Sequence, residues 1–383
     1  MISIETLTSE GLSADLDRRV RSAQALMRTH DLKLIAAVST GAPQFNGFLR
    51  YFTGAEMWGG REFLVLRPDT LERYVVIRST YDAEWLRVTA INTQVDSTLL
   101  EFLPPVRRFI QVAAGLTEGR GRIGVLNLHH LTAPEVTAVR EALPGVELVD
   151  LTAEMNRVRQ MKSSFEIEAI RYTGHTLAEA MDRFETLARP GRNASEVGGE
   201  VDGFLKGRGC FWGRVTYARD LQPEAMLPSP DWVFGADDVF TLRLTHNGPH
   251  GYWYDLSRVF AFKDFPANLA RGLETAEAAM REGSRALVPR GTSRQVGEAI
   301  DRVLGRDGAI SPRSSAVCES MGTDVGDSGA AELEFRENMV VALRPAARLQ
   351  GGRGVVLCET FVVQPQGGAA LSSMPSFTKR IKA

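Results

Sequence analysis

The chain has 383 residues, which predicts two domains, and its 44% hydrophobic and 24% charged residues are typical of a soluble globular protein. Its formal net charge of −2 gives no electrostatic reason to expect nucleic acid or an anionic membrane as a partner. No apolar run approaches the roughly 20 residues of a membrane helix, and the first residues lack the blocks of a signal peptide. Three cysteines without paired spacing (Cys210, Cys318 and Cys358) favour a cytoplasmic protein over a disulfide framework.

Residues 1–155 are predicted to form an N-terminal α/β domain. Apolar residues at helical spacing predict helices over residues 11–29 and 133–142. Apolar runs rich in β-forming residues predict strands at 34–38, 63–66, 74–77 and 123–128. Strands that alternate with helices favour a sheet covered by helices.

A second domain is predicted to span residues 156–383. Ser163 and Ser164 are the candidate N-caps of its first helix, because acidic residues follow in the next turn. Residues 187–209 and 287–308 then share one pattern, in which a helix, a Pro/Gly turn and a second helix precede a strand-rich stretch. A repeat of about 100 residues predicts a pseudo-twofold domain, since solenoid repeats are about 20–50 residues long. A chance likeness of two amphipathic helix pairs is the alternative.

The most informative segment is residues 251–258, which read Gly-Tyr-Trp-Tyr-Asp-Leu-Ser-Arg. This octet resembles the GY-x-x-D-[LIV]-[ST]-R signature of the creatinase/prolidase/aminopeptidase P/methionine aminopeptidase family. Further segments that are similar to the family follow in the expected order, at residues 51–62, 157–167, 318–322, 338–345 and 354–360. The resemblance implies an α/β fold, with a creatinase-like N-terminal domain followed by a duplicated "pita-bread" domain.

In metal-dependent members of that family, five side chains hold two metal ions that activate a water molecule. The corresponding positions here are Leu244, Asp255, Glu319, Arg344 and Glu359. A guanidinium is never deprotonated in a protein, and its repulsion from a divalent ion roughly 4 Å away costs several kcal/mol even at an effective dielectric near 20. We therefore expect no metal and no other cofactor, with Arg344 paired to one of the acids in place of a metal charge.

Creatinase is a metal-free member, and the resemblance implies a metal-independent enzyme that hydrolyses a non-peptide C–N bond in a small metabolite carrying a carboxylate. The histidine that creatinase uses has no counterpart in residues 224–230. The remaining candidates for catalysis are His246, Glu319, Glu359 and Asp255. His246 lies two residues after Leu244, so the two share a strand face, and imidazole titrates near neutral pH.

Four residues are candidates for substrate binding. The planar guanidinium of Arg344 suits a substrate carboxylate. Arg61 stands where creatinase has an arginine that reaches the partner subunit, which implies a homodimer with Arg61 donated across the interface. Tyr252 and Trp253 flank the signature aspartate. Structural ion pairs and core packing remain the alternatives for these arginines and aromatic residues.

Three other interpretations of the pocket stay open. Buried acids need partners, so one alternative is that the ion pairs only hold an inert site together. The fold also serves as a peptide- or protein-binding module without catalysis, and other relatives are lyases or biosynthetic enzymes. Cys318 and Cys358 each precede a pocket acid, and strand alternation predicts that both face the core.

Overall fold

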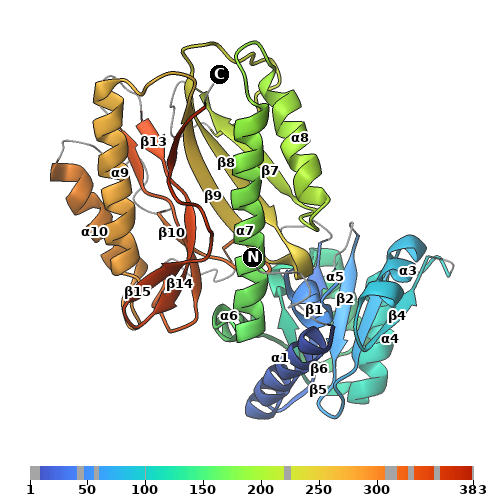
Figure 1. Cartoon of the computed structure of the whole chain (residues 1–383). Helices are drawn as coiled ribbons and strands as arrows, with labels where there is room; N and C mark the ends of the chain where they lie inside the picture. The colour runs from blue at the N-terminus through green and yellow to red at the C-terminus, as the bar shows by residue number, and fades with distance from the viewer. Residues whose placement is uncertain are drawn as a thin grey trace. The chain divides into compact units, whose positions relative to one another are not determined.

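The computed structural model describes residues 9–40, 47–55, 60–99, 101–219, 226–306, 317–326, 332–348 and 354–381 (Figure 1). The chain divides into two compact units, which separate between Arg159 and Gln160. Helix α6 (Thr152–Gln160) spans both this point and the boundary that the sequence suggested, between residues 155 and 156. None of the helices in the described ranges is long and apolar enough to cross a bilayer.

The N-terminal unit is built on a six-stranded mixed sheet in the order β4-β3-β2-β1-β5-β6. Its strands are β1 (Leu32–Ser39), β2 (Glu62–Leu66), β3 (Arg73–Ile77), β4 (Thr93–Ser97), β5 (Arg120–Leu126) and β6 (Gly145–Asp150). Its helices are α1 (Ser9–His30), α2 (Gly47–Thr53), α3 (Thr80–Thr89), α4 (Pro105–Thr117) and α5 (Ala133–Ala142), with a short 3₁₀ turn, η3 (Leu128–His130).

Both faces of this sheet are covered. Side chains of α1, α2 and α3 pack on one face, in a core that includes Ile35 and Ala37 of β1. Side chains of α4 and α5 pack on the other face, with Leu34 and Ala36 of the same strand. Burial on both faces explains why β1 is a continuous apolar run rather than an alternating one.

The C-terminal unit contains two helix pairs, each followed by strands, as the sequence repeat predicted. Helices α7 (Ser164–Leu187) and α8 (Ala194–Lys206) accompany a sheet of β16 (Thr378–Arg380), β9 (Trp253–Ala261), β8 (Val239–Asn247) and β7 (Gly213–Ala218). Helices α9 (Ala267–Arg285) and α10 (Ser293–Arg306) accompany a sheet of β10 (Cys318–Ser320), β11 (Val340–Leu343), β14 (Glu359–Gln364) and β15 (Gly367–Ala370). A two-stranded ladder, β12 (Ala346–Arg348) and β13 (Gly354–Val356), and a 3₁₀ turn, η5 (Pro249–Gly251), complete the unit. The final residues of the second repeat, 307 and 308, lie outside the described ranges.

The two sheets of this unit meet along β9 and β14. The Thr360 hydroxyl accepts a hydrogen bond from the Asp255 backbone N–H and donates one to the Asp255 carbonyl, both at 3.3 Å. The Ser257 N–H donates to the Cys358 carbonyl at 3.1 Å. These bonds place the start of β14 directly beside the strand that carries the signature aspartate.

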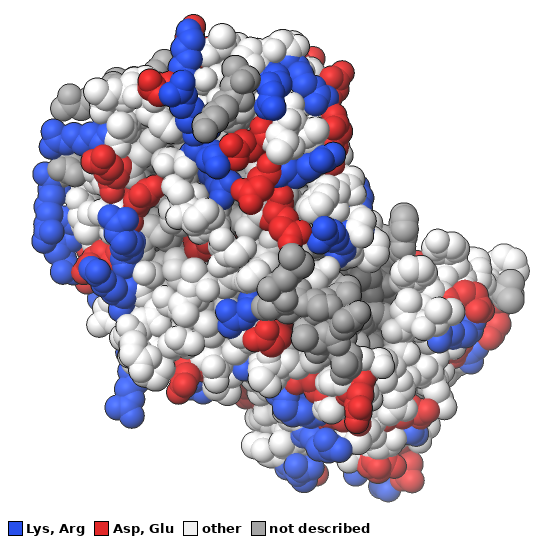
Figure 2. All heavy atoms as spheres, viewed as in Figure 1, with Lys and Arg blue, Asp and Glu red and all other residues white. Residues whose placement is uncertain are grey.

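On the face that Figure 2 shows, basic and acidic side chains are interspersed over both units. Most of the ion pairs involve partly exposed side chains, such as Lys206 with Asp202 and Arg208 with Glu179. This mixed surface agrees with the small net charge of the chain.

Helix α7 is held against the site strand at two points. Ser163 caps its N-terminus in a capping box with Glu166, as the sequence suggested, and Glu166 also accepts a hydrogen bond from the Tyr252 hydroxyl at 3.0 Å. Further along, Gly174 lets the Tyr254 ring approach the helix backbone, because a Cβ at Gly174 would lie 2.6 Å from the ring and 2.8 Å from the Leu371 carbonyl oxygen.

We expect Gly174→Ala to lower the free energy of unfolding by about 1–3 kcal/mol, because the new methyl group must displace a buried ring and a backbone carbonyl. Gly199→Ala in α8 is the matched control. A Cβ there meets nothing within 4 Å, so alanine should be neutral or stabilise the helix by about 0.5–1 kcal/mol. Urea unfolding of both variants checks this, and equal stability of the two would show that Tyr254 does not pack as described.

Candidate functional site

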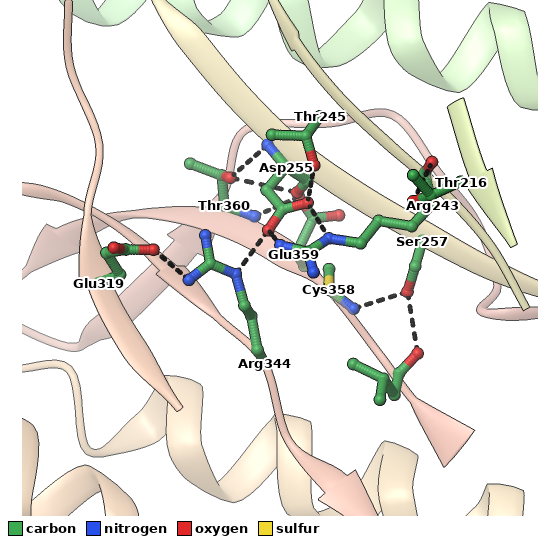
Figure 3. Close-up of polar contacts among 11 residues, drawn as sticks. Thr216, Arg243, Thr245, Asp255, Ser257, Glu319, Arg344, Cys358, Glu359 and Thr360 are labelled. Atoms are coloured by element: carbon green, nitrogen blue, oxygen red, sulfur yellow. Dashed lines mark hydrogen bonds and ion pairs between the residues drawn. The ribbon is translucent and has the colours of Figure 1, made fainter. Parts of the chain in front are cut away.

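Asp255 is at the centre of the polar cluster in the C-terminal unit (Figure 3). In the β8–β9 hairpin Thr245 pairs with Asp255, so Arg243 and Thr245 share the face of that aspartate. The Arg243 guanidinium donates two hydrogen bonds to this carboxylate, from Nε to Oδ1 at 2.7 Å and from Nη2 to Oδ2 at 2.5 Å. The Thr245 hydroxyl adds a third hydrogen bond to Oδ1 at 3.0 Å.

Arg344, which follows β11, approaches the same carboxylate from the other sheet. Its Nε donates to Asp255 Oδ2 at 2.6 Å, and its Nη1 donates to Glu319 of β10. The expected pairing of Arg344 with pocket acids is therefore present, and it involves two of the three acids at once. Figure 3 shows the guanidinium between the two carboxylates.

The electrostatics of Asp255 follow from these partners. The residue is fully buried, and burial alone would raise the pKa of its carboxyl group. The guanidinium groups of Arg243 and Arg344 outweigh that effect and hold the pKa of Asp255 well below its usual range. Asp255 is thus a permanent carboxylate at physiological pH.

Glu359 has a different environment although it lies close to Asp255. Its carboxyl group accepts hydrogen bonds from the Tyr254 hydroxyl and the Ser372 hydroxyl, each at 2.5 Å, and from the Thr360 N–H at 2.7 Å. Burial raises the pKa of Glu359 to about 7, and these hydrogen bonds oppose the rise only in part. A carboxyl group with a pKa near 7 is suited to accept and return a proton.

Both the N-terminal and the C-terminal part of the chain match known protein families. Residues 19–161 match the Creatinase/Prolidase N-terminal domain, and residues 168–365 match metallopeptidase family M24. The chain belongs to metallopeptidase family M24. The family resemblance and the fold class that the sequence suggested are both confirmed.

Proteins similar to this chain include dipeptidases, prolidases and aminopeptidases. The probable dipeptidase PepE of Mycobacterium tuberculosis (strain ATCC 25618 / H37Rv) is 20% identical over 262 residues, which cover 63% of this chain and 69% of the relative. The prolidase from Pyrococcus horikoshii OT3 superimposes with a TM-score of 0.77 at 15% identity, over 95% of this chain and 99% of that one. Dipeptidase PepE from Mycobacterium ulcerans gives a TM-score of 0.75 at 19% identity, over 97% and 99%. At these identities the two structures establish the fold alone.

The structure separates Leu244 and His246 from the cluster around Asp255. Leu244 pairs with Leu256, and His246 pairs with Tyr254, so both side chains lie on the opposite face of β8. His246 is fully buried there, with its Nε2 3.2 Å from the Asp202 carboxylate of α8. The expectation that His246 points toward the old metal positions is therefore wrong. Its shared face with Leu244 was predicted correctly, but that face is not the one that carries Asp255.

Arg243 is the residue that the sequence reasoning missed. Arg243 lies two residues before Thr245, and the hairpin register brings both side chains to the face that carries Asp255. The turn between the two strands is the sequence feature that could have located Arg243. The strands Val239–Asn247 and Trp253–Ala261 pair symmetrically about His250. Counting outward from that residue places Arg243 opposite Ser257, on the same face as Asp255.

The other three candidates for substrate binding, Arg61, Tyr252 and Trp253, have different surroundings in the structure. Arg61, in the N-terminal unit, pairs with Glu135 and donates from Nη2 to the His130 carbonyl at 2.6 Å. Tyr252 is buried, and its hydroxyl is bound to Glu166. Trp253 lies on the Asp255 face of β9, and its buried Nε1 has no hydrogen-bond partner within the described part of the chain.

The two cysteines next to the pocket acids are protonated at neutral pH. Burial raises the pKa of the Cys318 thiol to about 12 and that of Cys358 to about 11. Since the thiolate is the nucleophilic form of cysteine, neither side chain is suited to attack a substrate. The described ranges contain no cluster of three histidine, cysteine or acidic side chains that could hold an ion.

Removal of Arg243 should expose the cost of burying Asp255. We expect Arg243→Met to lower the free energy of unfolding by about 3 kcal/mol, because a buried carboxylate loses one of its two charged partners. The exposed Arg214 of the neighbouring strand provides the control, and Arg214→Met should change stability by less than about 0.5 kcal/mol. Urea unfolding at pH 7 measures both, and equal losses would contradict the role of Arg243.

Glu359 predicts a specific pH dependence of stability. Its pKa of about 7 in the folded protein lies above the ordinary value of 4.5, so its contribution to stability is present below pH 4.5 and is lost as the pH rises through 7. Glu359→Gln should remove this loss, and relative to wild type it should gain on the order of 3 kcal/mol between pH 4.5 and pH 8. Urea unfolding across that range tests the shift, with exposed Glu337→Gln as the control. Parallel profiles for wild type and Glu359→Gln would count against a raised pKa.

Proposed function

We propose that this M24 protein is a metal-independent hydrolase that cleaves a non-peptide C–N bond in a small metabolite carrying a carboxylate. The observation that supports this most directly is the Arg344 guanidinium between Asp255 and Glu319. A cation of the protein itself occupies the acidic cluster, and both oxygens of Asp255 are already engaged by guanidinium groups. The described side chains therefore do not fit a dinuclear metal centre.

A carboxylate has donors available in this cluster. Asp255 and Glu319 take up Nε and Nη2 of Arg243 and Nε and Nη1 of Arg344. Each guanidinium has one nitrogen left over, Nη1 in Arg243 and Nη2 in Arg344. Neither of these two atoms makes a hydrogen bond to a described residue. The two side chains are 20% and 11% exposed, so an anion from solvent can reach them. Two adjacent guanidinium groups favour a planar carboxylate that accepts from both.

Glu319 supports a substrate that also carries a cationic or amide nitrogen. Its side chain is 36% exposed, in contrast to the fully buried Asp255. Its carboxylate can therefore bind a nitrogen of the substrate while the arginines bind the carboxylate. The unpartnered indole N–H of Trp253 lies on the same face of β9 and adds one more donor.

Proton transfer is assigned to Glu359 in this proposal. Hydrolysis adds water across the C–N bond, so one proton must leave the attacking water and one must reach the departing nitrogen. A carboxyl group with a pKa of about 7 can carry that proton in either direction at neutral pH. The Tyr254 hydroxyl, hydrogen-bonded to Glu359, would hold the carboxyl group in place. His246 has no part in this step, because its ring is fully buried and its Nε2 lies 3.2 Å from the Asp202 carboxylate.

The proposal retains a cytoplasmic homodimer in which Arg61 reaches the partner subunit. In the single chain, the Arg61 guanidinium pairs with Glu135 and the His130 carbonyl. For Arg61 to reach the partner subunit, its ion pair with Glu135 would have to break. A stronger Arg61–Glu135 pair would therefore make this contact with the partner less favourable.

Purified protein treated with a chelator should hydrolyse one or more members of a panel of N-carbamoyl amino acids, N-acyl amino acids and creatine-like compounds. Arg344→Lys should lower kcat/KM by about 10–100-fold, because lysine cannot reproduce the paired hydrogen bonds to carboxylates. The exposed Arg336 gives a control, since Arg336→Lys should keep full activity.

Two results would overturn this proposal. Turnover of dipeptides only after addition of a divalent metal would indicate an M24 peptidase of the metal-dependent kind. Tight binding of panel members without any turnover, measured by calorimetry, would indicate a binding protein instead of an enzyme.

A further inference from the structure

Two buried carboxylates in the N-terminal unit have no role in the proposed hydrolysis. Glu62 is the first residue of β2 and is 0% exposed, and Asp82 is in the first turn of α3 and is 5% exposed. Neither oxygen of Glu62 has a hydrogen-bond partner in the described ranges, and Oδ1 of Asp82 has none either. Buried acids in folded proteins are normally paired or hydrogen-bonded, so three unsatisfied oxygens here require an explanation.

The two carboxyl groups face one small space beside Gly60. A Cβ placed on Gly60 would lie 3.0 Å from Glu62 Oε1 and 3.9 Å from Asp82 Oδ2. Among the described residues, apart from the chain neighbours of Gly60, it would meet no other heavy atom within 4 Å. The absence of a side chain at Gly60 therefore leaves room that, within the described ranges, carboxylate oxygens border. The φ angle of +133° at Gly60 is one that other residues rarely adopt.

The positively charged residue nearest to Glu62 in the sequence, Arg61, is bound to other groups. Arg61 follows Gly60, but its guanidinium binds Glu135 and the His130 carbonyl. Burial, with a smaller contribution from Asp82, raises the pKa of Glu62 to about 7, and the Ser39 side chain and the charge of Arg61 oppose this rise only in part. Burial also raises the pKa of Asp82. The pair therefore has an excess of negative charge that no described side chain neutralises by contact.

We propose that Glu62 and Asp82 bind one divalent cation of the oxygen-preferring class, Mg²⁺ or Ca²⁺. Two carboxylates match the charge of such an ion, and hard cations take carboxylate, hydroxyl and water oxygens as ligands. Ser39, which pairs with Glu62 in the β1–β2 ladder, brings a hydroxyl to the same place. The ion would join the start of β2 to the start of α3. This site is separate from the cluster around Asp255 and does not depend on the proposed hydrolysis.

The test uses the full-length protein after removal of metal with a chelator. Calorimetric titration with CaCl₂ and MgCl₂ should show one bound ion per chain, and thermal unfolding should shift upward by about 2–4 °C at saturation. NaCl at matched ionic strength should not reproduce the shift. Glu62→Gln and Asp82→Asn, which preserve side-chain size, should each abolish ion binding. Glu84→Gln in the same helix α3 is the matched control and should bind as wild type does.

Three outcomes would overturn the proposal. Absence of ion binding to wild type at pH 8 would show that the two carboxyl groups do not form a cation site. Binding that persists in both variants would place the ion elsewhere in the chain. Loss of binding in Glu84→Gln as well would show a diffuse surface effect. If Glu62→Gln does not fold, Asp82→Asn and the calcium content of dialysed wild type, measured by mass spectrometry, decide the question.

Discussion

The site depends on one buried carboxylate, that of Asp255, and on the two guanidinium groups that keep it charged. Without them, burial would force the carboxyl group to take up a proton. With them, three elements are tied together, because Arg243 lies on β8, Asp255 on β9 and Arg344 just after β11. The same ion pairs therefore hold the two sheets of the C-terminal unit together.

Neighbouring acids in this pocket have very different proton affinities. Asp255 is held ionised by two arginines, whereas Glu359, with only neutral donors around it, has a pKa of about 7. Glu319 shares Arg344 with Asp255 but remains partly exposed. In the proposed reaction, charge, proton transfer and solvent access are divided among three residues, as in many sites where two carboxyl groups have separate roles.

Much of the fold could be predicted from local patterns. The strands of the N-terminal sheet appear as apolar runs because both of their faces are buried, and the capping box at Ser163 is local by nature. The family signature located Asp255, and the ordered segments located Glu319, Arg344 and Glu359. The apolar pattern of the sequence did not predict some elements, such as β4 and β6. These strands are short and partly exposed, so their apolar signal is weak.

What the sequence alone determined is the identity of the residues and their order, and hence the family, the duplicated domain and the arginine among the pocket acids. The tertiary structure decided which residues meet. A shift of one residue in the register of the β8–β9 hairpin exchanges the two faces of each strand. That register brought Arg243 to Asp255 and took His246 away. The sequence marks a turn in this region, but only the tertiary structure centres the strand pairing on His250.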